Sequence, residues 1–178
     1  RKIKPEVYWD KAHPWTPLKL LFLPLWIPVY TSIIGKRYKN MVYVDLFADS
    51  GINYIKDRDV YIPGSPILAH LFSSPSFTKY VLCEKDRNYA EALKRRMIKL
   101  IEDSAKLYVY PQDVNGAIFE IVKHLEEKST HYFAFIDPEG MELKWRTLEK
   151  LLRYPGDILL LFNTNMIWRN REAALSGG

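Results

Sequence analysis

The sequence has 178 residues but only one cysteine, Cys83, and four histidines. A single cysteine excludes a disulfide framework within the chain and any metal site built from several of its cysteines, and it fits a reducing cytoplasmic setting. The histidines stand at positions 13, 70, 124 and 131 and show no spacing typical of metal ligands. We therefore expect no disulfide and no metal site built from cysteine or histidine in this chain.

Long apolar runs are also scarce. The longest covers residues 20–34, which is shorter than the roughly 20 residues that a membrane-spanning helix needs. Pro24 and Pro28 interrupt it. We expect a kinked helix or paired turns packed on the core, beginning near Thr16 with Pro17 at the first helical position, and no membrane insertion. No signal peptide is apparent at the N-terminus.

Length and composition indicate one globular domain over residues 1–178, because 48% hydrophobic residues are enough for a substantial core. Residues 1–40 are interpreted as an N-terminal arm and helix. In the arm, Tyr8, Trp9 and Trp15 can either pin it to the core or stack on nucleic-acid bases. The net charge of +5 favours a nucleic-acid partner only slightly.

Residues 41–51, MVYVDLFADSG, carry the first sign of a site. A short run rich in β-branched and aromatic residues predicts a buried strand of a parallel sheet. It leads through Asp45 into a turn of small residues that ends at Gly51. Ligands of open α/β sheets bind beyond the carboxyl ends of the strands, so this turn is a candidate nucleotide or cofactor site. The alternative is that Asp45 only caps a tight turn.

Four more apolar runs predict strands at residues 79–84, 107–110, 131–136 and 157–162. Helical patterns lie between them, at about residues 66–72, 85–103, 115–127 and 144–153. Residues 52–61 are interpreted as a polar loop, and Ser65 and Pro66 as the N-cap and first residue of the helix that follows. This alternation predicts an α/β fold with a Rossmann-like, doubly wound, mainly parallel sheet of at least five strands, preceded by an N-terminal helical segment.

Polar residues follow each predicted strand, and the sequence places them at one edge of the sheet. They are Asp45, Glu84, Asp113, Asp137 and Asn163. A carboxylate after the second strand can accept both hydroxyl protons of a ribose, and one after the third can accept from an exocyclic amine. Asp137, followed by Pro138, would meet a substrate amine or hydroxyl as an acceptor or base. For any single residue the alternative is turn capping.

Several motifs in the same order resemble the three-Cys-motif partner proteins, which are similar in fold to class I S-adenosylmethionine-dependent methyltransferases. The resemblance covers roughly residues 13–170 and rests on TPLKLLFLPLWIPV, YVDLFADSG, GSPILA, CEKD, QDVN, FIDPEG with Trp145, and LLLFNTN with Ile167 and Arg169. It implies the following site residues: Asp45, Phe47, Ala48 and Gly51 at the methionine end of the cofactor, Glu84 at the ribose, Asp113 and Val114 at the adenine, and Asp137 with Pro138 as the catalytic strand end.

The chain departs from this pattern in three places. Asp49 stands where family members usually carry glycine, which lets the backbone approach a ligand closely. The fourth-strand motif is DPEG, without the aromatic last residue that stacks on a flipped base in amino-methyltransferases. The sequence also ends soon after the fifth strand, where a methyltransferase adds an antiparallel hairpin, so we expect it to belong to a longer protein.

Three functions are compatible with these features. The first is methyl transfer from S-adenosylmethionine, with nucleic acid as one acceptor class. The second is a binding module that works with a three-Cys-motif protein, an iron–sulfur or radical-type partner by the family name, through the aromatic arm and the apolar segment 20–34. The third is a nuclease-like reaction around a divalent ion held by Asp45, Asp137 and Glu139.

Overall fold

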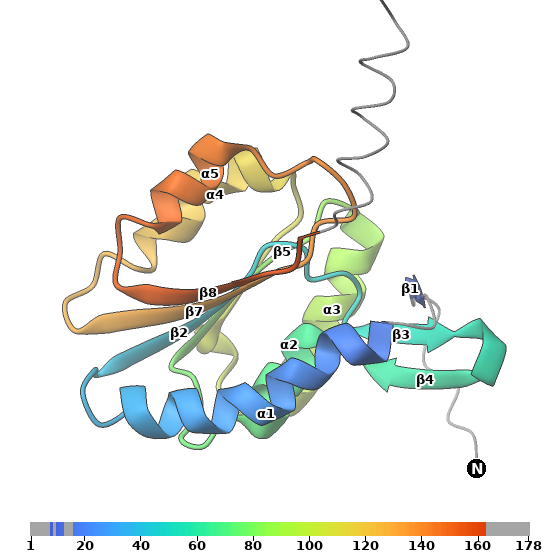
Figure 1. Ribbon diagram of the computed structural model, residues 1–178, viewed down its shortest axis with the longest axis horizontal. Helices are drawn as coiled ribbons and strands as arrows, with labels where there is room; N and C mark the ends of the chain where they lie inside the picture. Colours follow the sequence, from blue (N-terminus) through green and yellow to red (C-terminus); the bar gives the residue numbers. More distant parts are fainter. Residues whose placement is uncertain (1–7, 9, 13–15, 163–178) are drawn as a thin grey trace, which may run out of the picture.

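The computed structural model of the chain describes residues 8, 10–12 and 16–162. Its main feature is a five-stranded parallel sheet with the order β6-β5-β2-β7-β8 (Figure 1). The strands are β2 (Asn40–Asp45), β5 (Lys79–Cys83), β6 (Leu107–Tyr110), β7 (Thr130–Ile136) and β8 (Gly156–Leu160). Numbered by appearance in the chain, this order is 3-2-1-4-5, that of Rossmann-like doubly wound folds, so the predicted fold class is confirmed.

Helices cover both faces of the sheet (Figure 1). One face carries α1 (Thr16–Ile34), α2 (Ser65–Phe72) and α3 (Arg87–Leu100), and the other carries α4 (Val114–Lys123) and α5 (Trp145–Leu151). Helix α1 precedes the first strand of the sheet, whereas α2, α3, α4 and α5 each lie between two successive strands of the sheet in the chain. These four helices therefore belong to crossover connections between parallel strands.

Helix α1 is one continuous helix even though it contains Pro24 and Pro28. Its inner face buries Leu20, Leu23, Ile27 and Tyr30. Its outer face is apolar too and stays exposed; it consists of Leu18, Leu21, Phe22, Leu25, Trp26, Val29 and Ile33. By length and composition α1 could cross a membrane, although 28% of its most apolar window is buried inside the domain.

The prediction of a polar loop at residues 52–61 is wrong. This segment forms β3 (Ile52–Ile55), a 3-10 turn (Lys56–Arg58) and the start of β4 (Val60–Pro63), paired as an antiparallel hairpin. Asp59 closes the turn with a left-handed φ of 47°. Strand β1 (Asp10–Ala12) adds to β3 in parallel, so part of the N-terminal arm belongs to a small second sheet.

The prediction of a Ser65 N-cap is also wrong. Gly64 is the N-cap of α2, and the Ser65 hydroxyl instead hydrogen-bonds the Asp45 carboxylate. Gly64 is needed here because a Cβ on it would lie 3.0–3.1 Å from the backbone of Gly51. Gly51 itself has a φ of 79°, and its carbonyl accepts a hydrogen bond from the Gly64 amide at 2.8 Å. The turn after β2 is therefore fastened directly to the start of α2.

Candidate functional site

A cavity of about 620 Å³ opens at the carboxyl ends of the parallel strands. This size falls within the roughly 300–1,000 Å³ of typical ligand pockets. It lies where the strand order reverses, because β2 is flanked by β5 on one side and β7 on the other. Sheets of this kind bind ligands at that switch point.

The cavity wall brings together most of the residues that the sequence singled out. Phe47, Ala48, Glu84, Asp113, Val114, Asp137 and Pro138 all line it. These residues come from the ends of four different strands, and they converge because the strands are parallel and in register. Asn163, Trp9 and Trp15 lie outside the described residues.

Asp45 and Gly51 do not line the cavity. Asp45 is fully buried, and its carboxylate accepts hydrogen bonds from the Tyr43 hydroxyl at 2.8 Å and the Phe47 amide at 3.3 Å. Burial is the main cause that raises the pKa of Asp45 to about 7, partly opposed by hydrogen bonds from Ser65, Tyr43 and Phe47. Asp45 thus supports the turn that forms the cavity wall rather than facing a ligand.

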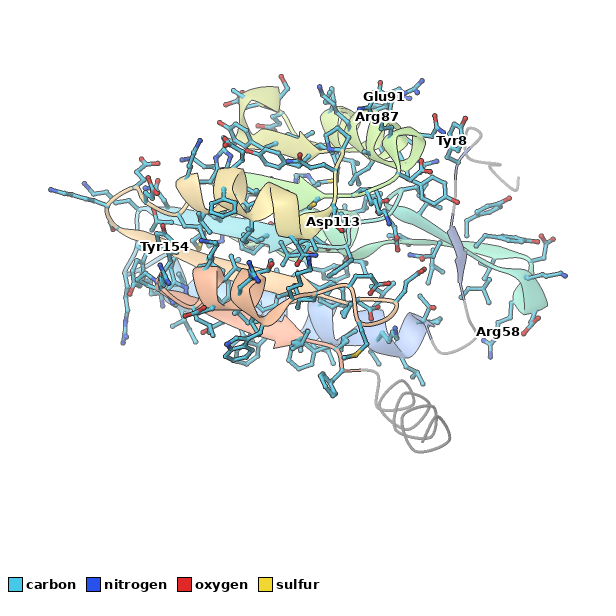
Figure 2. All side chains as sticks on the ribbon, turned by 90° about the horizontal axis from the view of Figure 1, so that it is seen from above. Tyr8, Arg58, Arg87, Glu91, Asp113 and Tyr154 are labelled. Carbon is cyan, nitrogen blue, oxygen red and sulfur yellow. The ribbon has the colours of Figure 1, made fainter. Side chains whose placement is uncertain are left out.

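Glu84 and Asp113 make local capping contacts as well as lining the cavity. The Glu84 carboxylate accepts from the Asp86 amide at 2.7 Å. Asp113 is the N-cap of α4, and its Oδ1 accepts from the amide of Asn115 at 2.9 Å (Figure 2 labels Asp113). Turn capping, the alternative reading of these acids, therefore holds for both, and it fixes the two carboxylates at the cavity edge.

Asp137 makes an ion pair that the sequence did not reveal. Lys19 of α1 donates to both carboxylate oxygens of Asp137, at 2.8 Å and 3.0 Å. The two residues are 118 positions apart, so no local pattern joins them. One feature of the sequence could have indicated it. Lys19 is the single charged residue in the sequence of α1, and a charge in an apolar helix is costly unless it is paired.

The lining is strongly acidic although the chain is basic overall. Seven carboxylates line the cavity: Asp49, Glu84, Asp86, Asp113, Asp137, Glu139 and Glu142. The described lining contains two cationic residues, Lys19 and Lys85. Asp49 has a left-handed φ of 49°, in the turn where the resemblance led us to look for glycine. A cavity of this charge favours a cationic ligand.

Two basic residues of α3, Arg95 and Arg96, make contacts outside the cavity. Arg96 donates to the carbonyls of Ser50, at 2.6 Å, and Tyr8. Arg95 pairs with Glu91 one turn earlier on the same helix. Tyr8 lies on the α3 side of the molecule, near Arg87 and Glu91 (Figure 2). Arg96 therefore has a structural role, whereas Lys94 and Lys99 are exposed on the same helix.

The described residues contain no group of three or more His, Cys, Asp or Glu side chains that could hold a metal ion. The nuclease-like triad is not assembled, because Asp45 is buried and does not line the cavity that Asp137 and Glu139 line. The three histidines of the described part pack against tyrosines: Tyr30 with His131, Tyr80 with His70, and Tyr110 with His124.

The sequence matches no protein-family model, and no curated protein matches it either. Similar solved structures include a Legionella pneumophila protein of the DUF519 family, with 20% identity, a TM-score of 0.48, and 68% of this chain and 55% of that chain covered. A conserved hypothetical protein from Streptococcus pyogenes has 20% identity, a TM-score of 0.42 and coverages of 72% and 67%. A "putative methylase" from Haemophilus influenzae has 16% identity, a TM-score of 0.46 and coverages of 75% and 71%.

The chain therefore spans about half the length of the Legionella protein. The fold assignment rests on the strand order of the chain itself. The resemblance to three-Cys-motif partner proteins stays a prediction.

Proposed function

We propose that the chain is a methyltransferase that binds S-adenosylmethionine in the cavity at the strand ends. The observation that carries this proposal is that one cavity, at the switch point of the sheet, is lined by Phe47, Ala48, Glu84, Asp113 and Asp137. When bound, this cofactor supplies an electrophilic methyl group on a positively charged sulfur.

The residues present suit such a ligand. Its sulfonium and ammonium groups are cationic, and the lining holds seven carboxylates against two lysines. Glu84 is half-buried at the end of β5, in the position from which an acid reaches a ribose in related folds. Pro138 is buried and follows Asp137 directly, which restricts the backbone conformation of the residue that would face the methyl acceptor.

The test is calorimetric titration of the folded chain with S-adenosylmethionine. We expect micromolar affinity and a loss of at least about tenfold in Glu84→Ala, which corresponds to about 1.4 kcal/mol. The matched control is Glu120→Ala, which removes the same charge from the exposed face of α4. Absence of binding by folded protein, or equal losses in both variants, would contradict the proposal.

A second candidate function is that of a scaffold for a three-Cys-motif protein. The outer face of α1 supports it, since Leu18 is 72% and Leu25 is 67% exposed. Exposed apolar faces of this extent mark interaction sites. In co-purification with a three-Cys-motif protein, Leu18→Glu with Leu25→Glu should abolish binding, and unchanged binding would rule out this face. For either function, we propose that the protein acts in the cytoplasm.

A further inference from the structure

The ion pair between Lys19 and Asp137 shows that a cation can bind at the end of the cavity next to β7. Asp137 follows β7 directly, and the Lys19 ammonium reaches it from the first turn of α1, which also lines the cavity. Both carboxylate oxygens accept from the same nitrogen, at 2.8 Å and 3.0 Å. An alkylammonium group thus already sits on the carboxylate that faces the cavity.

This pair is well suited to exchange. The Lys19 side chain is 37% exposed and that of Asp137 is 23% exposed, so water reaches both partners. Ion pairs with this degree of exposure contribute little to stability. Lysine is also a compact charge on a flexible stem, which can swing away without moving the helix. A ligand that offers an equivalent cation can therefore replace Lys19 on Asp137.

The surroundings select for positive charge. Of the described residues that line the cavity, only Lys19 and Lys85 are cationic, whereas seven are acidic. The negative charge of Asp137 also contributes, as the smallest cause, to the raised pKa of Asp45. Phosphate groups of a nucleic acid would meet repulsion at such a wall, because nucleic-acid affinity depends on neutralising cations.

We propose that the methyl acceptor is an amine that binds to Asp137 as its ammonium ion in place of Lys19, and that Lys19 occupies the amine position while the acceptor is absent. The ammonium would first give up a proton to Asp137 or to water, and the freed nitrogen lone pair would then form the bond to the methyl carbon while the bond between that carbon and the sulfonium breaks. The inference that this amine accepts a methyl group rests on the proposed function. Binding of an amine to Asp137 can be measured without the cofactor. Lys19 is in this view a specificity-determining residue rather than a catalytic one.

The experiment measures n-butylammonium binding by calorimetry and by chemical shifts of the cavity residues. Lys19→Met frees Asp137, so we expect the affinity to rise at least about tenfold over the unchanged chain. Lys85→Met is the matched control: it removes an equal charge from the same lining but leaves the ion pair with Asp137 in place, so we expect a gain below about threefold. Adding Asp137→Asn to Lys19→Met should remove the gain.

Equal gains in the two lysine variants would overturn the inference, since they would reflect the general field of the cavity. So would tighter binding of a single-stranded oligonucleotide than of the amine. Lys19→Gln serves as a second variant if Lys19→Met unfolds, and circular dichroism establishes the fold in each case. Titration of the same variants with S-adenosylmethionine separates the two proposals: amine binding without cofactor binding contradicts only the methyltransferase, and the reverse contradicts only the role of Lys19.

Discussion

The two faces of the central sheet are packed with different kinds of side chain. The face under α1, α2 and α3 is aromatic and carries Tyr30, Tyr43, Phe77, Tyr80, Phe133 and Phe135. The face under α4 and α5 is mainly aliphatic and carries Val42, Val44, Val81, Ile118, Ile121 and Ile136. Alternation along β2 separates the two, because Tyr43 and Asp45 point to one side while Val42 and Val44 point to the other.

The two faces also differ in the polar contacts that their side chains make. The aromatic face contains hydroxyl groups that bind specific partners, such as Tyr43 with Asp45 and Tyr30 with His131, at 2.8 Å in each case. Lys19 also comes from the α1 side. The aliphatic face mainly supplies apolar packing. We infer that the aromatic face positions the candidate site, whereas the aliphatic face chiefly supplies stability.

The largest expected effect comes from removing an aromatic ring at the centre of the aromatic face. Phe133 is 1% exposed and lies with its ring centroid 5.3 Å from that of Tyr30. Phe133→Ala should lower the free energy of unfolding by about 3–5 kcal/mol, because a large cavity remains. Ile121→Ala, on the aliphatic face, should cost about 2–5 kcal/mol by the same mechanism. Urea unfolding of both variants measures the comparison, and a cost for Phe133→Ala below 1 kcal/mol would contradict it.

The next effect concerns Asp45 and depends on pH. Burial raises its pKa from about 3.8 to about 7, so between these values the folded protein binds more protons than the unfolded chain. The free energy of unfolding should therefore fall as the pH rises from about 4 to about 7, by on the order of a few kcal/mol, and this loss should be complete above that range. In Asp45→Asn the slope should disappear. Unfolding curves between pH 4 and 9 test this, and an unchanged slope in the variant would show that another group is responsible.

A smaller effect compares one hydroxyl on each face. The Tyr132 hydroxyl, on the aliphatic side, donates to the carbonyl of Leu151 at 2.9 Å in a buried site. Tyr132→Phe removes this buried bond, while the carbonyl keeps the bond from the Tyr154 amide at 3.0 Å, and the change should cost about 1–1.5 kcal/mol. Tyr30→Phe removes a partly buried bond to His131 and should cost about 0.5–1.5 kcal/mol. Thermal unfolding of the two variants gives the order, and the reverse order would mean that the His131 contact is the stronger one.

The sequence predicted the parallel sheet well because its strands are continuous apolar runs buried on both faces. β6 coincides with the predicted residues 107–110, and the other strands agree to within two residues at each end. Prediction failed for the hairpin, where four-residue strands surround the charged turn Lys56–Arg58 and burial alternates only briefly. The polar composition of residues 52–61 gave no strand signal, because β3 and β4 are short and pair with each other and with β1.

The candidate site was predictable in part for the same reason. The ends of parallel strands share one edge, so Glu84, Asp113 and Asp137 could be placed together without coordinates. Sequence alone could not separate Asp45 from that set, because its burial depends on the packing of Ser65 and Tyr43 around it. Nor could it place Lys19, since the packing of α1 brings that residue into contact with Asp137, which is 118 positions away in the sequence.

The contacts of Arg96 have a consequence for the order in which the chain assembles during synthesis. Its guanidinium joins the carbonyl of Ser50 to that of Tyr8, which lies 88 residues earlier. At translation rates of roughly 5–20 residues per second, this anchor for Tyr8 leaves the ribosome roughly 4–18 seconds after Tyr8 does. The contact between Arg96 and Tyr8 therefore forms only after α3 has been synthesised, and a nascent chain stalled before Arg96 should lack this anchor for Tyr8.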